Sequence, residues 1–202
     1  MGIIAIVGAG NVGQAIAGHM TLLGHEVRLY SRWERDFEAI TSTGGIELSG
    51  DVEGRAAKPL LTTDLVTAVR GADTIIVAAP AFAHAYFSEQ LAALLEPGQL
   101  VVFQPGVLGS SLELARHFAL AQRRPCLIAE TATSLYTCRL RGPAKVFIGA
   151  IKQAVPLATI PNAACQEALA RLSPYFGNRY VDGTDTLSVG LGNCNAIYHV
   201  PP

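Results

Sequence analysis

Hydrophobic positions in the first thirty residues follow two different periods. The unbroken apolar run Ile3–Val7 is typical of a strand buried in a parallel sheet, and a second strand-like run covers Glu26–Tyr30. Between them, apolar residues recur at helical spacing from Val12 to Leu23, and Gly24 stands where a helix C-cap belongs. The chain therefore opens with a predicted strand, helix and second strand.

The same alternation continues through most of the chain. Further strands are predicted at Thr74–Ala78, Leu100–Phe103, Cys126–Ala129 and Lys145–Ala150, and helices at Leu65–Val69, His84–Leu95, Gly109–Ala121 and Ala163–Leu172. Strands and helices in this order predict the α/β class, with a doubly wound, mostly parallel sheet.

Polar residues and glycines mark the ends of several predicted elements. Asp64 and Asn162 are placed as helix N-caps, and Ser110 with Glu113 has the spacing of a capping box. Between residues 40 and 64, closely spaced glycines interrupt short alternating pieces, which predicts a small inserted hairpin.

The turn after the first strand carries the clearest chemical signal. Gly8-Ala9-Gly10-Asn11-Val12-Gly13 has the G-x-G-x-x-G spacing of a dinucleotide-binding loop. In such a loop Gly8 permits the tight turn, Gly10 admits a pyrophosphate and Gly13 allows close packing of helix and strand. The free N–H groups of the helix N-terminus would face the phosphates. We therefore predict a Rossmann-type dinucleotide-binding domain, with Asn11 and Val12 also at the cofactor.

The end of the second strand bears on which dinucleotide binds. An NAD-specific site normally has an acidic residue here for the ribose hydroxyls, whereas this chain has Ser31 followed by Arg32. A guanidinium can hold a 2′-phosphate and stack on adenine, so we predict NADP(H) over NAD(H). The alternative is that Arg32 is a solvated surface residue, which the nearby Glu34 and Asp36 keep open.

Later strand ends supply further candidates, because parallel sheets bind ligands beyond the carboxyl ends of their strands. Pro80 and Gly106 follow two predicted strands and are expected at the cofactor. The polar run Glu130–Arg139 follows another strand and is interpreted as a loop at the same edge.

Composition excludes several functional classes. Fifteen basic and 16 acidic residues give a net charge of −1, so no basic face for nucleic acid is expected. No apolar run reaches the ~20 residues needed to cross a bilayer, so no membrane partner is expected. Four cysteines without C-x-x-C spacing favour reduced thiols, a cytoplasmic protein and no metal site.

The last segment predicts the start of another helix. Asn195 and His199 are four residues apart and share a face if this segment is helical. We expect residues 1–182 to form the dinucleotide-binding domain and residues 183–202 to begin a truncated helical domain for substrate binding and dimerisation.

Several motifs together resemble the octopine/nopaline (opine) dehydrogenase family. The glycine loop is shared by many dehydrogenases, but Glu130–Arg139 and the Asn-x-Asn-x-x-x-His run at 193–199 are more specific. The remaining motifs are Pro80-Ala81-Phe82-Ala83-His84 and Gln104-Pro105-Gly106.

The resemblance implies an NAD(P)-dependent oxidoreductase acting on a CH–NH donor. The amine of an amino acid would join a 2-oxo acid, and hydride would reduce the resulting imine carbon. His199 would match the family's catalytic proton donor and acceptor, a role that its ordinary pKa suits. Thr133, Cys138 and Asn195 would match substrate positions.

Family members continue into a helical domain that carries a substrate-binding arginine and the aspartate partnering the histidine. We therefore expect this chain alone to bind NADP(H) and to turn over slowly, and exposed apolar residues near its end could favour a homo-oligomer. Two alternatives stay open. One is another two-domain dehydrogenase of the 6-phosphogluconate, glycerol-3-phosphate or ketopantoate reductase type, and the other is a non-catalytic nucleotide-binding module.

Overall fold

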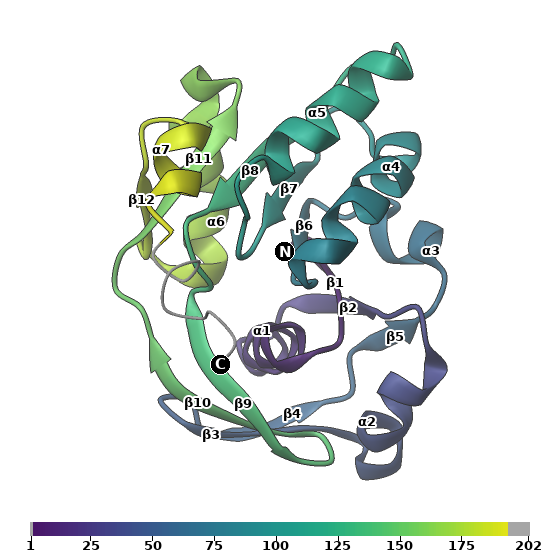
Figure 1. Cartoon of the computed structure of the whole chain (residues 1–202). Helices are drawn as coiled ribbons and strands as arrows, with labels where there is room; N and C mark the ends of the chain where they lie inside the picture. Colours follow the sequence, from purple (N-terminus) through teal and green to yellow (C-terminus); the bar gives the residue numbers. More distant parts are fainter. Residues whose placement is uncertain (1, 194–202) are drawn as a thin grey trace, which may run out of the picture. The chain divides into compact units, whose positions relative to one another are not determined.

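The computed structural model describes residues 2–193, and the chain divides into two compact units. The first unit comprises Met1–Ala79 and Tyr136–Lys152, and the second comprises Pro80–Leu135 and Gln153–Pro202. Both units are built from strands covered by helices (Figure 1). No helix formed by residues 2–193 combines the length and the hydropathy that crossing a bilayer requires.

The first unit contains four parallel strands in the order β5-β2-β1-β6. Their bounds are Ile3–Val7 (β1), Glu26–Tyr30 (β2), Leu60–Thr62 (β5) and Thr74–Val77 (β6), and the helices of this unit are Asn11–Leu22 (α1), Glu34–Phe37 (η1), Glu38–Thr43 (α2) and Leu65–Val69 (α3). The strands predicted at Ile3–Val7, Glu26–Tyr30 and Thr74–Ala78 are confirmed as β1, β2 and β6, and the helices predicted at Val12–Leu23 and Leu65–Val69 are confirmed as α1 and α3. Asp64 caps α3 as predicted, its side chain accepting from the Val66 and Thr67 N–H groups.

The first unit contains a second sheet, of which the sequence predicted only the hairpin. The predicted hairpin is present as β3 (Gly45–Gly50) and β4 (Gly54–Ala57), paired antiparallel. It joins β10 (Lys145–Ile151) and β9 (Tyr136–Gly142) in a four-stranded sheet of order β4-β3-β10-β9. The prediction that Glu130–Arg139 forms a loop is wrong for most of its length. Its first two residues end β8, and Tyr136–Arg139 begin β9.

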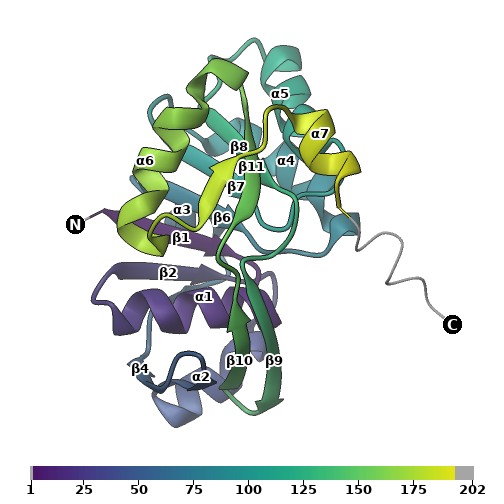
Figure 2. The same ribbon diagram turned by 90° about the vertical axis from the view of Figure 1, so that its left-hand side faces the viewer.

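Helix α1 lies between the two sheets of the first unit, as Figures 1 and 2 show. Seven of its twelve residues are buried, which a helix with only one covered face would not achieve. Gly18 makes this packing possible, because a Cβ there would come within 2.9 Å of the Leu48 side chain. On the same side, His19 Nδ1 and the Tyr136 hydroxyl are hydrogen-bonded at 2.7 Å.

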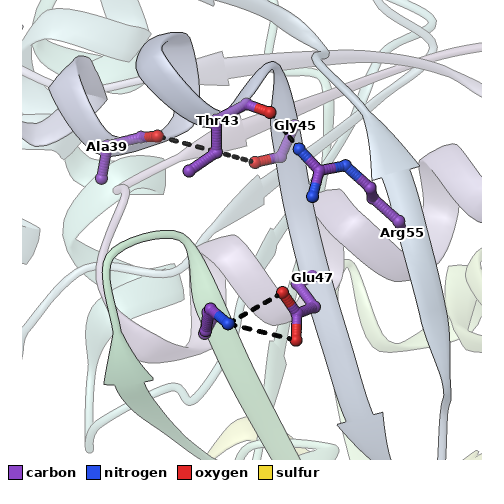
Figure 3. Close-up of polar contacts among 6 residues, drawn as sticks. Ala39, Thr43, Gly45, Glu47 and Arg55 are labelled. Carbon is purple, nitrogen blue, oxygen red and sulfur yellow. Dashed lines mark hydrogen bonds and ion pairs between the residues drawn. The ribbon is translucent and has the colours of Figure 1, made fainter.

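Side chains bound to backbone carbonyl groups hold the connection from α2 to β3 (Figure 3). The Thr43 hydroxyl lies 2.8 Å from the carbonyl oxygens of both Ala39 and Gly45, and Arg55 donates to the Thr43 carbonyl. Gly45 is required because a Cβ at this position would lie 2.0 Å from the Ala56 carbonyl oxygen. These contacts fix the helix beside the strand hairpin.

The second unit has four strands in the order β12-β11-β8-β7. Strands β7 and β8 are parallel, and β11 runs antiparallel to β8. The strands are Leu100–Phe103 (β7), Leu127–Thr131 (β8), Val155–Ile160 (β11) and Tyr180–Asp182 (β12), and the helices are Ala81–Ala83 (η2), His84–Leu94 (α4), Ser110–Leu120 (α5), Asn162–Ala164 (η3), Cys165–Phe176 (α6) and Thr186–Leu191 (α7). Helices α4 and α5 lie on one face and α6 on the other (Figure 2). The predicted mostly parallel, doubly wound α/β class is confirmed.

Two of the predicted caps in this unit are wrong. Gly109, not Ser110, is the N-cap of α5, and Glu113 contacts His117 and Arg116 instead of returning to the helix start. Asn162 does not cap α6, because it begins the short helix η3 and Ala164 precedes α6. The boundary predicted after residue 182 falls just before α7 and stays a prediction.

Candidate cofactor site

The glycine loop of the first unit has the geometry that close backbone contacts demand. Gly8 has φ +117°, and a Cβ there would lie 2.6 Å from the Ala78 carbonyl oxygen. A Cβ on Gly13 would lie 1.7 Å from the Gly8 carbonyl oxygen, so only glycine allows the loop and helix to touch. The Gly8 N–H donates to the Tyr30 carbonyl at 2.9 Å, which ties the loop to β2.

Gly10 differs from these two glycines, because open space surrounds its Cα. A Cβ there would meet nothing within 4 Å, and Gly10 is the N-cap of α1 without any side-chain cap. The N–H groups of the first turn of α1 are therefore left for another acceptor. This arrangement fits a pyrophosphate held at the helix N-terminus.

Asn11 and Val12 stand at the start of α1, both half-buried. The Asn11 side chain is already engaged, since its Oδ1 accepts from the Leu140 N–H at 2.8 Å. Asn11 thus links the loop to β9, a role for which its sequence position gave no signal.

At the end of β2, Ser31 is buried and Arg32 is exposed. The Ser31 hydroxyl donates to the Asp36 carboxylate and lies 3.3 Å from the Trp33 N–H that donates to it. The Arg32 Cζ lies 5.3 Å from the centre of the Trp33 ring, and the Arg35 Cζ lies 5.2 Å from it. Trp33 and Arg35 were missed at the sequence level, although an aromatic residue between two arginines was the available signal.

Two predicted cofactor residues, Pro80 and Gly106, lie in the second unit. Each follows the end of a strand by three residues, Pro80 after β6 and Gly106 after β7. Pro80 is exposed and precedes η2, whereas Gly106 is buried. The Gly106 N–H donates to the Thr131 carbonyl at 2.9 Å, and a Cβ on Gly106 would come within 2.8 Å of the Glu130 Cβ. Gly106 is thus packed directly on β8.

Glu130 is a buried carboxylic acid beside this turn, only 1% exposed. Its Oε2 accepts from the Ser111 N–H at 2.9 Å, so Glu130 on β8 caps the N-terminal turn of α5. Burial raises the pKa of the Glu130 carboxyl group, while the hydrogen bonds from Ser111 oppose that rise. Among residues 2–193 no group is hydrogen-bonded to its Oε1.

The predicted substrate residues are not brought together within one unit. Thr133 follows β8 in the second unit, where its carbonyl accepts from the Thr131 hydroxyl at 3.0 Å. Cys138 lies half-buried on β9 in the first unit, and burial raises the pKa of its thiol to about 11. Asn195 and His199 lie outside the described residues.

His84, which opens α4, is 3% exposed. Its Nδ1 is hydrogen-bonded to the Ser110 hydroxyl at 2.8 Å, and its ring lies against Phe103. These contacts join α4, α5 and β7, so His84 supports the core of the second unit.

The fold and the glycine loop together define an α/β domain of the dinucleotide-binding type. The sequence profile of ketopantoate reductase PanE/ApbA matches residues 4–154. The chain therefore belongs to this family, one of the alternatives that the sequence left open.

Comparisons also confirm the resemblance to opine dehydrogenases. The chain is 33% identical over 199 residues to opine dehydrogenase of Arthrobacter sp. (strain 1C), covering 98% of this chain and 55% of that protein. Octopine dehydrogenase with NADH and L-arginine matches 98% of this chain and 52% of its own, with a TM-score of 0.84 at 20% identity. NADP⁺-bound yersinopine dehydrogenase has a TM-score of 0.74 at 18% identity, covering 96% and 50%. This chain spans about half the length of these relatives.

Proposed function

We propose that this chain binds NADP(H) through the N-terminus of α1. The observation that carries the proposal is the contrast between glycines in one loop. Gly8 and Gly13 are closed in by backbone atoms, whereas Gly10 faces open space in front of an uncapped helix. A pyrophosphate would complete the hydrogen bonding of that helix end.

The preference for NADP(H) over NAD(H) is proposed from the end of β2. Arg32 is exposed there, and the Asp36 carboxylate is held by the Ser31 hydroxyl. A guanidinium is the group best suited to a 2′-phosphate, because it donates two parallel hydrogen bonds to phosphate oxygens. Pro80 and Gly106 are proposed as further cofactor contacts from the second unit.

The reaction we propose is that of an opine dehydrogenase. An amino acid's amine condenses with a 2-oxo acid, water leaves, and hydride from NADPH reduces the imine carbon. His199 would give and take the proton, and Thr133, Cys138 and Asn195 would contact substrate. Sequence similarity over nearly the whole chain to opine dehydrogenase supports this proposal.

A second candidate is reduction of a 2-oxo acid without an amine, which the ketopantoate reductase profile favours. The two reactions differ in one reactant. NADPH oxidation measured with pyruvate alone, and then with pyruvate plus a panel of amino acids, separates them. A rate that needs the amine supports the opine reaction, and an equal rate without it supports the second candidate.

Binding is tested independently of turnover. Titrations with NADPH and NADH should show tighter binding of NADPH. Tight binding without turnover in any mixture would favour a non-catalytic module, whereas binding of neither dinucleotide would overturn the whole proposal.

We also propose a cytoplasmic location and self-association. Cys126, Cys138 and Cys165 are unpaired thiols, as expected in a reducing compartment. Leu187 and Leu191 of α7 are 57% and 73% exposed, and such apolar surface favours a homo-oligomer. Sedimentation of the purified chain tests the second point.

A further inference from the structure

The segment that follows β2 presents two different faces. An open cavity is lined by Glu34, Phe37, Glu38 and Thr41, at positions i, i+3, i+4 and i+7, together with residues 58–63. Trp33, Arg35 and Asp36 do not line that cavity. The carboxylates Glu34 and Glu38 therefore belong to the cavity lining, whereas Arg35 and Asp36 do not.

Outside the cavity lining, Trp33 lies between Arg32 and Arg35 in sequence, and both guanidinium groups are close to its ring. The Arg32 and Arg35 Cζ atoms lie 5.3 and 5.2 Å from the centre of its ring, within the range of cation–π attraction. Trp33 is 51% exposed, so this cluster is open to solvent. The two guanidinium groups can be no further apart than the sum of these two distances.

Arg35 is an exposed cation of the first unit. Within residues 2–193 its guanidinium makes no ion pair or hydrogen bond, and its contact is with the Trp33 ring. The neighbouring carboxylate of Asp36 accepts a hydrogen bond from the Ser31 hydroxyl. Arg35 is thus a cation held in place by an aromatic ring and still able to donate to an anion.

We propose that Arg35 is a second ligand for the 2′-phosphate of NADP(H), held beside Arg32 by the Trp33 ring. This inference rests on the proposed binding of NADP(H) and adds a residue that determines its selectivity. Two guanidinium groups can share the oxygens of one phosphate monoester, whereas NAD(H) has only a ribose hydroxyl to offer there. Removing Arg35 should therefore weaken the phosphorylated dinucleotide alone.

Trp33 makes a direct test possible, because it is the only tryptophan in the chain. Its fluorescence is titrated with adenosine 2′,5′-bisphosphate and with 5′-AMP, two ligands that differ only in the 2′-phosphate. The wild-type chain should bind the bisphosphate more tightly. Arg35→Gln should lose about tenfold in affinity for the bisphosphate and for NADPH. Its affinity for 5′-AMP and NADH should stay within about twofold.

The matched control is Arg116→Gln, which removes an equal charge from an exposed position on helix α5 of the second unit. It should leave all four affinities unchanged, and Arg35→Lys should restore part of the lost affinity. Arg32→Gln tests the proposed function separately.

If Arg32→Gln weakens NADPH binding and Arg35→Gln does not, the role of Arg35 is overturned and the proposed function stands. Equal losses for NADPH and NADH in Arg35→Gln would likewise overturn it, since they indicate a general disturbance of the loop. A wild-type chain that binds none of the four ligands would overturn the proposed function and this inference with it.

Discussion

Asn11 Oδ1 accepts a hydrogen bond of 2.8 Å from the Leu140 N–H, across 129 residues of sequence. The bond joins the first residue of α1 to the strand β9 of the second sheet. The helix end that we propose for pyrophosphate binding is therefore braced from the side opposite β1. The hydrogen bond thus links the glycine loop directly to the four-stranded sheet β4-β3-β10-β9.

Replacing Asn11 should separate the two roles of this residue. Asn11→Ala removes the acceptor for the Leu140 N–H, and because water can reach that group the stability loss should be about 1 kcal/mol. Asn11→Asp keeps the acceptor and favours the helix dipole, so stability should be retained. Its added negative charge should nevertheless weaken NADPH binding. Urea unfolding and NADPH titration of both variants measure the two effects, and equal NADPH affinity in wild type and Asn11→Asp would contradict the placement of the pyrophosphate.

Two glycine substitutions in the same loop should behave in opposite ways. Gly13→Ala places a Cβ 1.7 Å from a backbone oxygen that cannot move away, so we expect a stability loss of about 3 kcal/mol or more. Gly10→Ala meets no atom and has φ −78°, so the protein should fold with a loss below about 1 kcal/mol. Its methyl group should instead obstruct NADPH. A Gly10→Ala variant with wild-type NADPH affinity would place the cofactor elsewhere.

The first βαβ unit was predictable because its determinants are local. The apolar run Ile3–Val7, the helical spacing after Gly10 and the glycine after the helix each act within a few residues. The second sheet was not predictable, because β10 pairs with β3 about one hundred residues earlier in the chain. The polar residues of β9 resemble a loop until their partners, α1 and β10, are known.

The candidate site divides in the same way. The glycine loop and Arg32 could be identified from spacing, whereas Arg35 depends on η1 bringing its side chain back to Trp33. Glu130 was noticed as one polar residue among many, but its burial and its bond to Ser111 follow from the packing of α5 on β8. The local conformation of η1 decides the first case and packing between distant elements decides the second, and no hydrophobic period reports either.

Cys138 should behave as an unreactive thiol. Burial raises its pKa to about 11, so at pH 8 its thiolate fraction should be about 100-fold lower than that of a thiol with the ordinary value of 9.0. Alkylation by iodoacetamide, followed by mass spectrometry of the peptide containing Cys138, should be slow in the folded protein. The same thiol in urea is the control and should react quickly. Rapid modification of the folded chain would show that Cys138 is activated.

Glu130 should make stability depend on pH in a direction opposite to that of most carboxylates. Its folded-state pKa is raised by burial, so the native state binds the proton more tightly than the unfolded state does. Stability is then fully present below the unfolded pKa and falls as the pH rises through the folded pKa. The loss is about 1.4 kcal/mol for each pH unit that separates the two pKa values.

Glu130→Gln removes this titration while keeping an oxygen that can accept from the Ser111 N–H. The constant difference between the two proteins also contains the cost of burying an amide, so the prediction concerns its change with pH. Measured by urea unfolding from pH 4 to pH 8, the free energy of unfolding of Glu130→Gln should gain on wild type as the pH rises. Glu113→Gln removes a more exposed carboxylate from α5, the helix to which Glu130 is hydrogen-bonded from β8, and serves as the control. Parallel curves for Glu130→Gln and wild type would show that the Glu130 carboxyl group titrates alike in the folded and unfolded chains, and that its burial carries no electrostatic cost.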